Sequence, residues 1–466
     1  MAAVAERPRP VLHQEYCKGC GRCIEACTPG CIEAGTAIHP LTGLLPVTLH
    51  LESCNGCGLC VEACPEPYGM VAGDAPRLSP GASPRPFGRP PREPAAADEP
   101  AERVALPETR PLMLKGAHAA AVGALLAGCR HVYGYPITPS TDGAELMARL
   151  LPGLGGTFVQ AVSEVATVNM MYGCGGAGRP AMTFTSSPGF SLMLEGISFM
   201  IGAEVPGVFV NVMRGGPGLG NIGPEQSDVK LACHGLGHGH TQAVVLAPST
   251  PQEMLDLTFL AFELSFRYRN PVVVLADGYL GQMTGRVRLP PALVRPGLPA
   301  WAVPGDAAHR QNLICSFHLA EPDLEAHNHR LTEKYRRIAA AEQRADLYRC
   351  EDAEVLLVAC HMPARMAKGA VRVLRGEGVA AGLFRPQTLW PFPVDALRPL
   401  LGRARRVVVV EASEGQLEDE LRLALAREGT ALPALAHVRR CGGMLPSQRE
   451  IVEGVRAALR AGEARA

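Results

Sequence analysis

From about Leu112 to Met283, short apolar runs rich in β-branched residues alternate with longer apolar stretches that contain many alanines and glycines. The short runs include VFVNVM and PVVVLAD, and the longer ones include AHAAAVGALLAGC and SEVATVNMMYGCGGAG. Continuous apolar runs are typical of parallel strands buried on both faces, and the longer stretches are typical of the helices that cover them. The pattern therefore predicts an α/β fold built on a parallel sheet.

The same alternation returns near Glu354, with EVLLVAC, GVAAGLF and RVVVVEA as candidate strands. A polar stretch, DLEAHNHRLTEKYRRIAAAEQRADLY, precedes it and predicts a helical connector. Proline, alanine and charged residues dominate the region before Leu112, which predicts a disordered linker. The pattern thus predicts a cysteine-rich module at 1–72, a Pro/Ala-rich linker at 73–110, an α/β domain at 111–290, a helical connector at 291–350 and a second α/β domain at 351–466.

Charge and composition narrow the classes of function. The 466 residues include 45 Lys and Arg and 45 Asp and Glu, a balance that argues against a general nucleic-acid-binding protein. No apolar run approaches the roughly 18 residues of a membrane span, and the first residues lack the apolar core of a signal peptide. Nine of the 16 cysteines precede residue 65, as expected for thiolate ligands in a reducing compartment. We therefore expect a cytoplasmic protein with no membrane and no nucleic acid among its partners.

Two cysteine runs, CKGCGRCIEAC and CNGCGLCVEACP, share the spacing C-x2-C-x2-C-x3-C. This is the pattern of a two-cluster bacterial ferredoxin, in which the fourth cysteine of each run binds the other cluster. Zinc ribbons use two C-x2-C pairs instead, and a disulfide framework needs an oxidising compartment. Cys31 is an extra thiol, interpreted as a small buried side chain. The spacing predicts one 4Fe-4S cluster on Cys17, Cys20, Cys23 and Cys64, and a second on Cys54, Cys57, Cys60 and Cys27.

A loop with two prolines, GYPITPSTDG, follows a predicted strand at residues 134–143. Its prolines fix two φ angles and exclude regular structure. Because open α/β sheets bind ligands at the carboxyl ends of their strands, the hydroxyls of Thr138 and Ser140 are candidate ligand contacts. The alternative is a plain turn with a helix cap at Ser140 or Thr141.

Two charged residues stand out in apolar surroundings. Glu164 lies among small and apolar residues, either as a solvated carboxylate at a helix start or as a partly buried acid. Arg214 follows a strand and precedes a glycine-rich segment, where it can bind a carboxylate or phosphate bidentately or pair with Glu225 or Asp228. The nucleotide P-loop signature is absent.

Together, GYPITPS, the Glu164 segment, TSSPGFSLMLEGISF and NVMRGGPGLGNI resemble the α subunit of the 2-oxoacid:ferredoxin oxidoreductases. The branch that the sequence looks most like acts on 3-methyl-2-oxobutanoate (2-oxoisovalerate). The cysteine-rich module resembles the small ferredoxin (δ) subunit of the same complexes, so the chain looks like a δ–α fusion. The resemblance implies a pyrimidine-type thiamin-diphosphate domain, a transketolase-C-like α/β domain after it, and an α+β ferredoxin module before both.

The resemblance also implies roles for individual residues. Glu164 would hydrogen-bond N1′ of thiamin diphosphate and so favour removal of the C2 proton to form the ylid. Arg214, Thr138 and Ser140 would bind the 2-oxoacid. The residues expected to line the cofactor beside Glu164 are Tyr135, Pro136 and Ile137.

One motif of thiamin enzymes is missing, because Ala276-Asp277-Gly278 lacks the asparagine of a diphosphate–magnesium site. A β subunit is therefore expected to share thiamin diphosphate and Mg2+ with this chain, and the family also has a γ subunit. The implied reaction is oxidative decarboxylation of a branched-chain 2-oxoacid, with coenzyme A as cosubstrate and ferredoxin as electron acceptor. The alternatives are the same chemistry on 2-oxoglutarate, pyruvate or an aryl 2-oxoacid, or an electron-transfer adaptor without its own catalysis.

Overall fold

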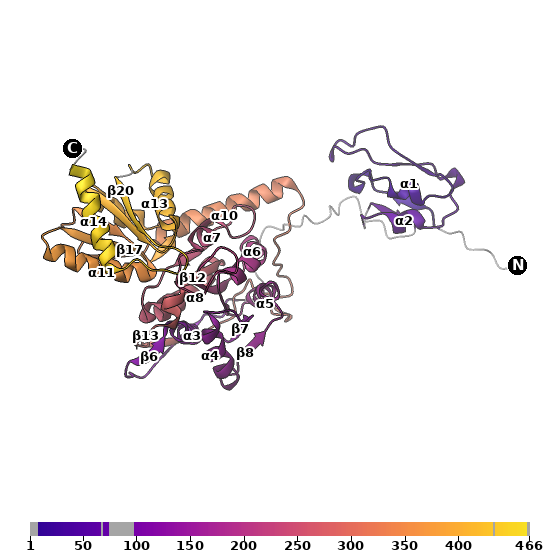
Figure 1. Ribbon diagram of the computed structural model, residues 1–466. Coiled ribbons are helices and arrows are strands. Elements are labelled where there is room, and N and C mark those ends of the chain that lie inside the picture. Colours follow the sequence, from indigo (N-terminus) through magenta and orange to yellow (C-terminus); the bar gives the residue numbers. More distant parts are fainter. Residues whose placement is uncertain (1–7, 67–68, 74–96, 432–433, 464–466) are drawn as a thin grey trace. The chain divides into compact units, whose positions relative to one another are not determined.

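The chain forms two units, Met1–Pro86 and Phe87–Ala466 (Figure 1). The computed structural model describes residues 8–66, 69–73, 97–431 and 434–463.

The first unit consists of two similar halves built around the two cysteine runs. Its small core includes Cys23, Cys31 and Cys60 and only a few aliphatic side chains, so little apolar surface is buried. The outer strands β1 and β4 pair antiparallel, as do the inner strands β2 and β3. In chain order the elements are β1 (Pro10–Leu12), α1 (Arg22–Ala26), β2 (Ile32–Glu33), β3 (Thr48–Leu49), α2 (Leu59–Ala63) and β4 (Met70–Ala72).

A seven-stranded sheet with the order β18-β11-β12-β10-β9-β7-β8 forms the centre of the second unit. All neighbouring strands are parallel except β18, which runs antiparallel to β11. Every residue of β9, β10 and β12 is buried, which explains their uninterrupted apolar sequence and confirms the predicted α/β sheet. The strands are β7 (His131–Gly134), β8 (Thr157–Gln160), β9 (Ala181–Thr185), β10 (Gly207–Met213), β11 (Val244–Leu246), β12 (Pro271–Asp277) and β18 (Thr388–Trp390).

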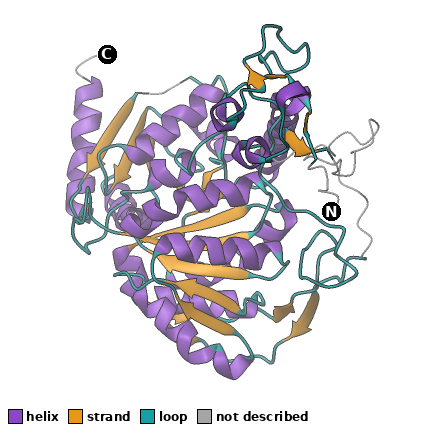
Figure 2. Cartoon of the chain, turned by 90° about the vertical axis from the view of Figure 1, so that its right-hand side faces the viewer, coloured by secondary structure: helices purple, strands orange, loops and turns teal. Residues whose placement is uncertain are grey.

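Helices cover both faces of this sheet (Figure 2). Several begin where the sequence supplies a cap. The Ser163 hydroxyl accepts a hydrogen bond from the N–H of Ala166, and the Thr250 hydroxyl accepts one from the N–H of Glu253. The helices are α3 (Gly116–Leu126), α4 (Thr141–Leu150), α5 (Glu164–Gly176), α6 (Ser187–Gly202), α7 (Val229–His234), α8 (Pro251–Tyr268) and α9 (Gly278–Gln282).

The C-terminal α/β region contains a five-stranded sheet with the order β15-β17-β16-β19-β20. The helical connector predicted at 291–350 is present as α10, but residues near the end of that predicted connector form β15, which pairs antiparallel with β17. The elements are α10 (Glu321–Ala341), β15 (Ala345–Tyr348), β16 (Val355–Val358), α11 (His361–Gly376), β17 (Ala381–Pro386), α12 (Val394–Leu401), β19 (Arg406–Glu411), α13 (Gln416–Arg427), β20 (Leu435–Arg439) and α14 (Gln448–Glu463).

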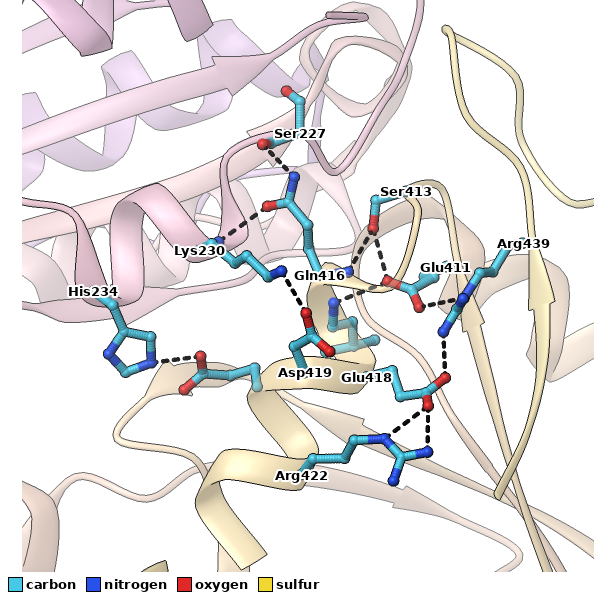
Figure 3. Close-up of polar contacts among 12 residues, drawn as sticks. Ser227, Lys230, His234, Glu411, Ser413, Gln416, Glu418, Asp419, Arg422 and Arg439 are labelled. Atoms are coloured by element: carbon cyan, nitrogen blue, oxygen red, sulfur yellow. Dashed lines mark hydrogen bonds and ion pairs between the residues drawn. The ribbon is translucent and has the colours of Figure 1, made fainter. Parts of the chain in front are cut away.

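Polar contacts join the two sheets of the second unit through α7 and α13 (Figure 3). Gln416 donates from Nε2 to the Ser227 carbonyl at 2.7 Å, and its Oε1 accepts from the Lys230 N–H at 3.0 Å. His234 contacts the buried Glu420 at 2.7 Å. In addition, β18 comes from the C-terminal region yet completes the first sheet. The two α/β regions are therefore interlocked rather than merely adjacent.

The prediction of a disordered linker at residues 73–110 is partly wrong. Residues 74–96 lie outside the described residues, but Glu102–Ala105 form β5, which pairs antiparallel with β14 (Ala292–Arg295). A second pair follows directly, between β6 (Leu112–Lys115) and β13 (Thr284–Val287). These backbone hydrogen bonds are made to segments far along the chain, so local composition does not reveal them.

Candidate functional site

The structure places the thiols of the first unit around two hollows, in the same two groups of four that the spacing predicts. One hollow is lined by Cys17, Cys20, Cys23 and Cys64, and the other by Cys27, Cys54, Cys57 and Cys60. Within the described residues, no three His, Cys, Asp or Glu side chains converge closely enough to hold a single metal ion. The fourth cysteine of each run does cross to the hollow formed by the other run.

The surroundings of the thiols suit a bound iron–sulfur cluster. Burial, and then the negative charge of the neighbouring Cys17 thiolate, raise the pKa of Cys23 to about 11. Iron would supply the positive charge that stabilises such buried thiolates. Gly19 has a φ of +64°, and a Cβ on it would lie 2.3 Å from the Leu45 carbonyl oxygen, so the tight turn between Cys17 and Cys20 requires glycine. Cys31 is buried, as expected, and also lines the second hollow.

Glu164 lies in the second unit, at the first position of α5, directly after the turn that follows β8. Its side chain is 5% exposed. No described residue donates a hydrogen bond to its carboxylate or forms an ion pair with it. The residue as a whole is buried, whereas its carboxylate oxygens are not among the fully buried polar atoms that lack a partner, so a ligand or solvent can reach them.

A cradle of small residues adjoins the Glu164 carboxylate. A Cβ built on Gly189, in the first turn of α6, would lie 2.4 Å from Glu164 Oε1 and 2.5 Å from Thr185 Oγ1. The hydroxyls of Thr185 and Ser186 are buried and make no hydrogen bond within the described residues. Polar groups without a protein partner therefore lie where β9 ends and α6 begins, and each keeps its capacity to form a hydrogen bond.

Arg214 follows β10 and is 8% exposed. Its Nη1 donates to the Thr138 carbonyl at 2.9 Å, and its Nη2 donates to the Leu219 carbonyl at 3.1 Å, whereas its buried Nε has no partner among the described residues. No ion pair joins it to Glu225 or Asp228 within the described part of the chain. Arg214 thus fixes two loops and retains unused N–H groups, which is compatible with binding an anion.

The loop after β7 reaches Arg214 through its backbone. Thr138 is exposed, and its carbonyl accepts the Arg214 bond. Ser140 differs from the prediction, because it is 1% exposed and its hydroxyl donates to the Ile137 carbonyl at 2.7 Å. Neither does its side chain cap α4. The serine hydroxyl therefore stabilises the turn, and Thr138 is the hydroxyl that this loop presents.

The other loop residues differ in their access to solvent. Tyr135 and Pro136 are exposed, and Ile137 is half-buried. Gln282, which the sequence did not single out, donates to the Pro139 carbonyl at 3.1 Å and to Asp142 at 2.5 Å. Together with Arg214 it holds the loop from two sides.

Both carboxylate oxygens of Asp277 accept hydrogen bonds from backbone N–H groups. One of its carboxylate oxygens accepts from the N–H of Leu280 at 2.9 Å, and the other accepts from the N–H of Met362 at 2.9 Å. Burial raises the pKa of Asp277 to about 6. This aspartate caps α9 and binds the start of α11, which agrees with the absence of a diphosphate–magnesium motif at this point of the sequence.

Glu164, Thr185, Gly189, Arg214 and Thr138 thus gather at the carboxyl edge of neighbouring strands. The chain passes from β7 to β8 on one side of it and then returns to β9 on its other side, so the strand order reverses at β7. Such a switch point is where open α/β sheets bind ligands.

Comparison with known proteins agrees with this geometry. The family model for the thiamin-diphosphate-binding domain of pyruvate flavodoxin/ferredoxin oxidoreductase matches residues 122–343, that for core domain II of pyruvate:ferredoxin oxidoreductase matches 353–451, and that for a 4Fe-4S dicluster domain matches 12–67. The ketoisovalerate oxidoreductase subunit VorB of Methanothermobacter thermautotrophicus is 47% identical over 346 residues, covering 74% of this chain and 97% of that protein.

The chain belongs to the 2-oxoacid:ferredoxin oxidoreductase family. The 2-oxoglutarate synthase subunit KorA of Archaeoglobus fulgidus is 40% identical over 317 residues, covering 66% of this chain and 90% of that protein. The 2-oxoglutarate:ferredoxin oxidoreductase of Magnetococcus marinus, solved with 2-oxoglutarate, coenzyme A and succinyl-CoA, superimposes with a TM-score of 0.68 at 26% identity, covering 75% of this chain and 65% of that chain. This family member therefore combines a 4Fe-4S dicluster domain with a thiamin-diphosphate-binding domain in one chain.

Proposed function

We propose that this chain is a δ–α fusion subunit of a complex that oxidises branched-chain 2-oxoacids, above all 2-oxoisovalerate, to acyl-CoA and carbon dioxide. Its electrons pass through two 4Fe-4S clusters to ferredoxin. The observation that supports this most directly is the carboxylate of the largely buried Glu164, which has no partner among the described residues and faces Gly189.

Thiamin diphosphate, when bound, supplies a carbon nucleophile that attacks the keto carbon of the substrate. The contribution of this chain is to hold and move a proton. Glu164 would hydrogen-bond the pyrimidine N1′, while the glycine at 189 leaves room for the carboxylate. Arg214 and Thr138 would hold the carboxylate shared by all 2-oxoacids.

A thiamin-diphosphate-binding β subunit would complete the site. Asp277 is buried and caps α9 with its carboxylate, and no diphosphate–magnesium motif accompanies it in the sequence. Large apolar side chains also surround the carboxyl edge of the sheet and remain exposed, as expected for a surface that another subunit covers. They are Tyr135 (42%), Val162 (89%), Leu219 (81%), Ile222 (61%) and Tyr279 (52%).

The γ subunit and the acceptor ferredoxin are proposed from the family alone. A cytoplasmic location suits the eight thiolate ligands. Within the described residues, no helix is long and apolar enough to cross a membrane.

The branched-chain substrate is supported by the higher identity to the ketoisovalerate subunit than to the 2-oxoglutarate subunits. It is also supported by the segment Ser186–Leu194, which contains no cation that could neutralise a second carboxylate. The 2-oxoglutarate alternative requires such a cation from another subunit.

Replacing Glu164 by glutamine in the assembled complex tests the proposal. The C2-proton exchange of thiamin diphosphate, followed by NMR, should slow by about 10²–10⁴-fold, which is the contribution of a general acid–base group. Glu195→Gln is the matched control, because Glu195 is exposed on α6. Equal exchange in both variants would remove Glu164 from the mechanism.

A further inference from the structure

Asp228 is a buried acid to which the proposed chemistry gives no role. It lies directly before α7 and is 6% exposed. No ion pair reaches it within the described part of the chain. Although it occupies the capping position of α7, its side chain makes no capping hydrogen bond. Neither a charged partner nor a helix cap therefore explains why an acid stands at this position.

Three neutral donors hold the Asp228 carboxylate. Oδ2 accepts from Ser187 Oγ at 2.6 Å and from Asn211 Nδ2 at 2.9 Å, and Oδ1 lies 3.2 Å from Ser227 Oγ. Burial raises the pKa of Asp228, and the hydrogen bonds from these three side chains oppose that rise. Because the donors belong to α6, β10 and the segment before α7, the carboxylate joins three parts of the chain.

The two serines also hold the main chain of Arg214, the first residue after β10. Its N–H donates to Ser187 Oγ at 3.1 Å, and its carbonyl accepts from Ser227 Oγ at 2.9 Å. Ser227 is itself fixed by the C-terminal α/β region, because Gln416 of α13 donates to the Ser227 carbonyl at 2.7 Å (Figure 3). Asp228 therefore reaches Arg214 through two serine hydroxyls and not through an ion pair.

A carboxylate suits this task because it only accepts hydrogen bonds. The Ser187 hydroxyl donates its single hydrogen to Asp228, which leaves an oxygen lone pair for the N–H of Arg214. An amide in place of the carboxylate could also donate, so the serine hydroxyl would lose its one preferred direction. The guanidinium of Arg214 is fixed separately, by the carbonyls of Thr138 and Leu219. Asp228 thus acts where this side chain leaves the backbone, and the two carbonyls act at its far end.

We propose that Asp228 is a positioning residue, which holds Arg214 in place for binding the carboxylate of the 2-oxoacid and acts through the hydroxyls of Ser187 and Ser227. This inference rests on the proposed function, in which Arg214 binds that carboxylate. It gives Asp228 no contact with substrate or cofactor. Loss of the Asp228 carboxylate therefore weakens substrate binding and leaves the proton transfer at Glu164 unchanged.

The variant Asp228→Asn, in the complex co-expressed with its companion subunits, tests the inference, because asparagine keeps the size of the side chain and removes its charge. KM for 2-oxoisovalerate, measured by coenzyme-A-dependent reduction of viologen, should rise by about tenfold, as expected when hydrogen bonds that hold the binding group are lost. The value of kcat should change much less, because Arg214 binds a carboxylate that is present before the chemical step. C2-proton exchange of thiamin diphosphate without substrate should keep its rate.

Glu420→Gln is the matched control for loss of stability. It removes the charge of another buried acid, which contacts His234 and makes no hydrogen bond to Arg214, Ser187 or Ser227 within the described residues. Its melting temperature should fall, whereas KM for 2-oxoisovalerate should stay at the unmodified value. A rise in KM that accompanies Asp228→Asn but not Glu420→Gln therefore reports positioning and not stability.

A double-mutant cycle shows whether Asp228 acts through Arg214. Arg214→Gln should lower kcat/KM for 2-oxoisovalerate, and adding Asp228→Asn to it should lower kcat/KM little further. An equal loss in both backgrounds would overturn the inference, and so would an unchanged KM or slower C2-proton exchange in Asp228→Asn. Ser187→Ala keeps the carboxylate and breaks its link to the Arg214 N–H. If Asp228→Asn does not assemble, an unmodified KM in Ser187→Ala would overturn the inference.

Failure of the proposed function gives a different result. An unmodified complex that no 2-oxoacid reduces, or an Arg214→Gln complex with an unmodified KM, would reject the proposed function. An active complex in which Arg214→Gln raises KM and Asp228→Asn does not would reject this inference alone.

Discussion

Gly189 allows a sharp test of the catalytic role proposed for the Glu164 carboxylate. A methyl group at this position would lie 2.4 Å from Glu164 Oε1 and 3.0 Å from Glu164 Cδ. Ordinary contacts of this kind begin near 3.4 Å. The carboxylate would therefore have to retreat by about 1 Å, and a misplacement of that size near a reacting group costs about 10²-fold in rate.

The same substitution should leave the fold intact. The colliding atoms belong to the flexible end of the Glu164 side chain and to the Thr185 hydroxyl, 2.5 Å away, so the clash falls on side-chain atoms and not on the backbone. Replacing glycine by alanine within a helix also favours folding by about 0.5–1 kcal/mol. Gly189→Ala should therefore keep a melting temperature close to that of the unmodified chain and still assemble.

The assay is C2-proton exchange of thiamin diphosphate in the assembled complex, measured by NMR. Exchange should slow by about 100-fold in Gly189→Ala. Gly173→Ala is the matched control, because this glycine lies in α5 and its Cβ would meet nothing within 4 Å. If both alanine variants exchange at the unmodified rate, the carboxylate beside Gly189 does not act on the cofactor. If Gly189→Ala unfolds, the cradle is not as adaptable as the geometry implies.

Three further predictions concern the clusters, the cofactor and the loop after β7. Anaerobically purified chain should contain about eight irons in two 4Fe-4S clusters, and four irons or fewer in intact unmodified protein would contradict the two-cluster assignment. In Cys64→Ser, EPR should show damage to the cluster of Cys17, Cys20 and Cys23. Calorimetry should find weak or no thiamin-diphosphate binding by this chain alone and binding by the co-expressed complex, and tight magnesium-dependent binding by the chain alone would mean that it contains a complete site. Ser140→Ala should lower the free energy of unfolding by about 1 kcal/mol, because a hydrogen bond of the turn is lost, and should leave KM for 2-oxoacids unchanged. A raised KM would mean that Ser140 contacts the substrate.

Much of the fold follows from local pattern. Continuous β-branched runs such as those of β10 and β12 predict buried parallel strands, because a strand that is buried on both faces has apolar residues at every position and not at alternate ones. The cysteine spacing likewise predicts two groups of four thiols, since ligand spacing is a local constraint.

Features that depend on distant pairing could not be predicted. Neither the addition of β18 to the first sheet nor the pairing of β5 with β14 leaves a local signal, because backbone hydrogen bonds do not depend on side-chain type. At the site, Ser140 appeared as a ligand contact from its motif, but its hydroxyl is used inside the turn. Gly189 was one glycine among many, and only the Glu164 carboxylate opposite it shows why that position must be small.

The central claim is that this chain takes part in oxidising 2-oxoacids, and one measurement tests it most directly. Coenzyme-A-dependent reduction of viologen by the assembled complex should be followed across 2-oxoisovalerate, its branched relatives, pyruvate, an aryl 2-oxoacid and 2-oxoglutarate. An apolar pocket separates substrates that differ by one methylene by only about 10–200-fold, so several 2-oxoacids should react. The account predicts the highest kcat/KM for 2-oxoisovalerate and its branched relatives. A preference for 2-oxoglutarate would contradict the branched-chain assignment, and the absence of coenzyme-A-dependent reduction with every 2-oxoacid would contradict the central claim itself.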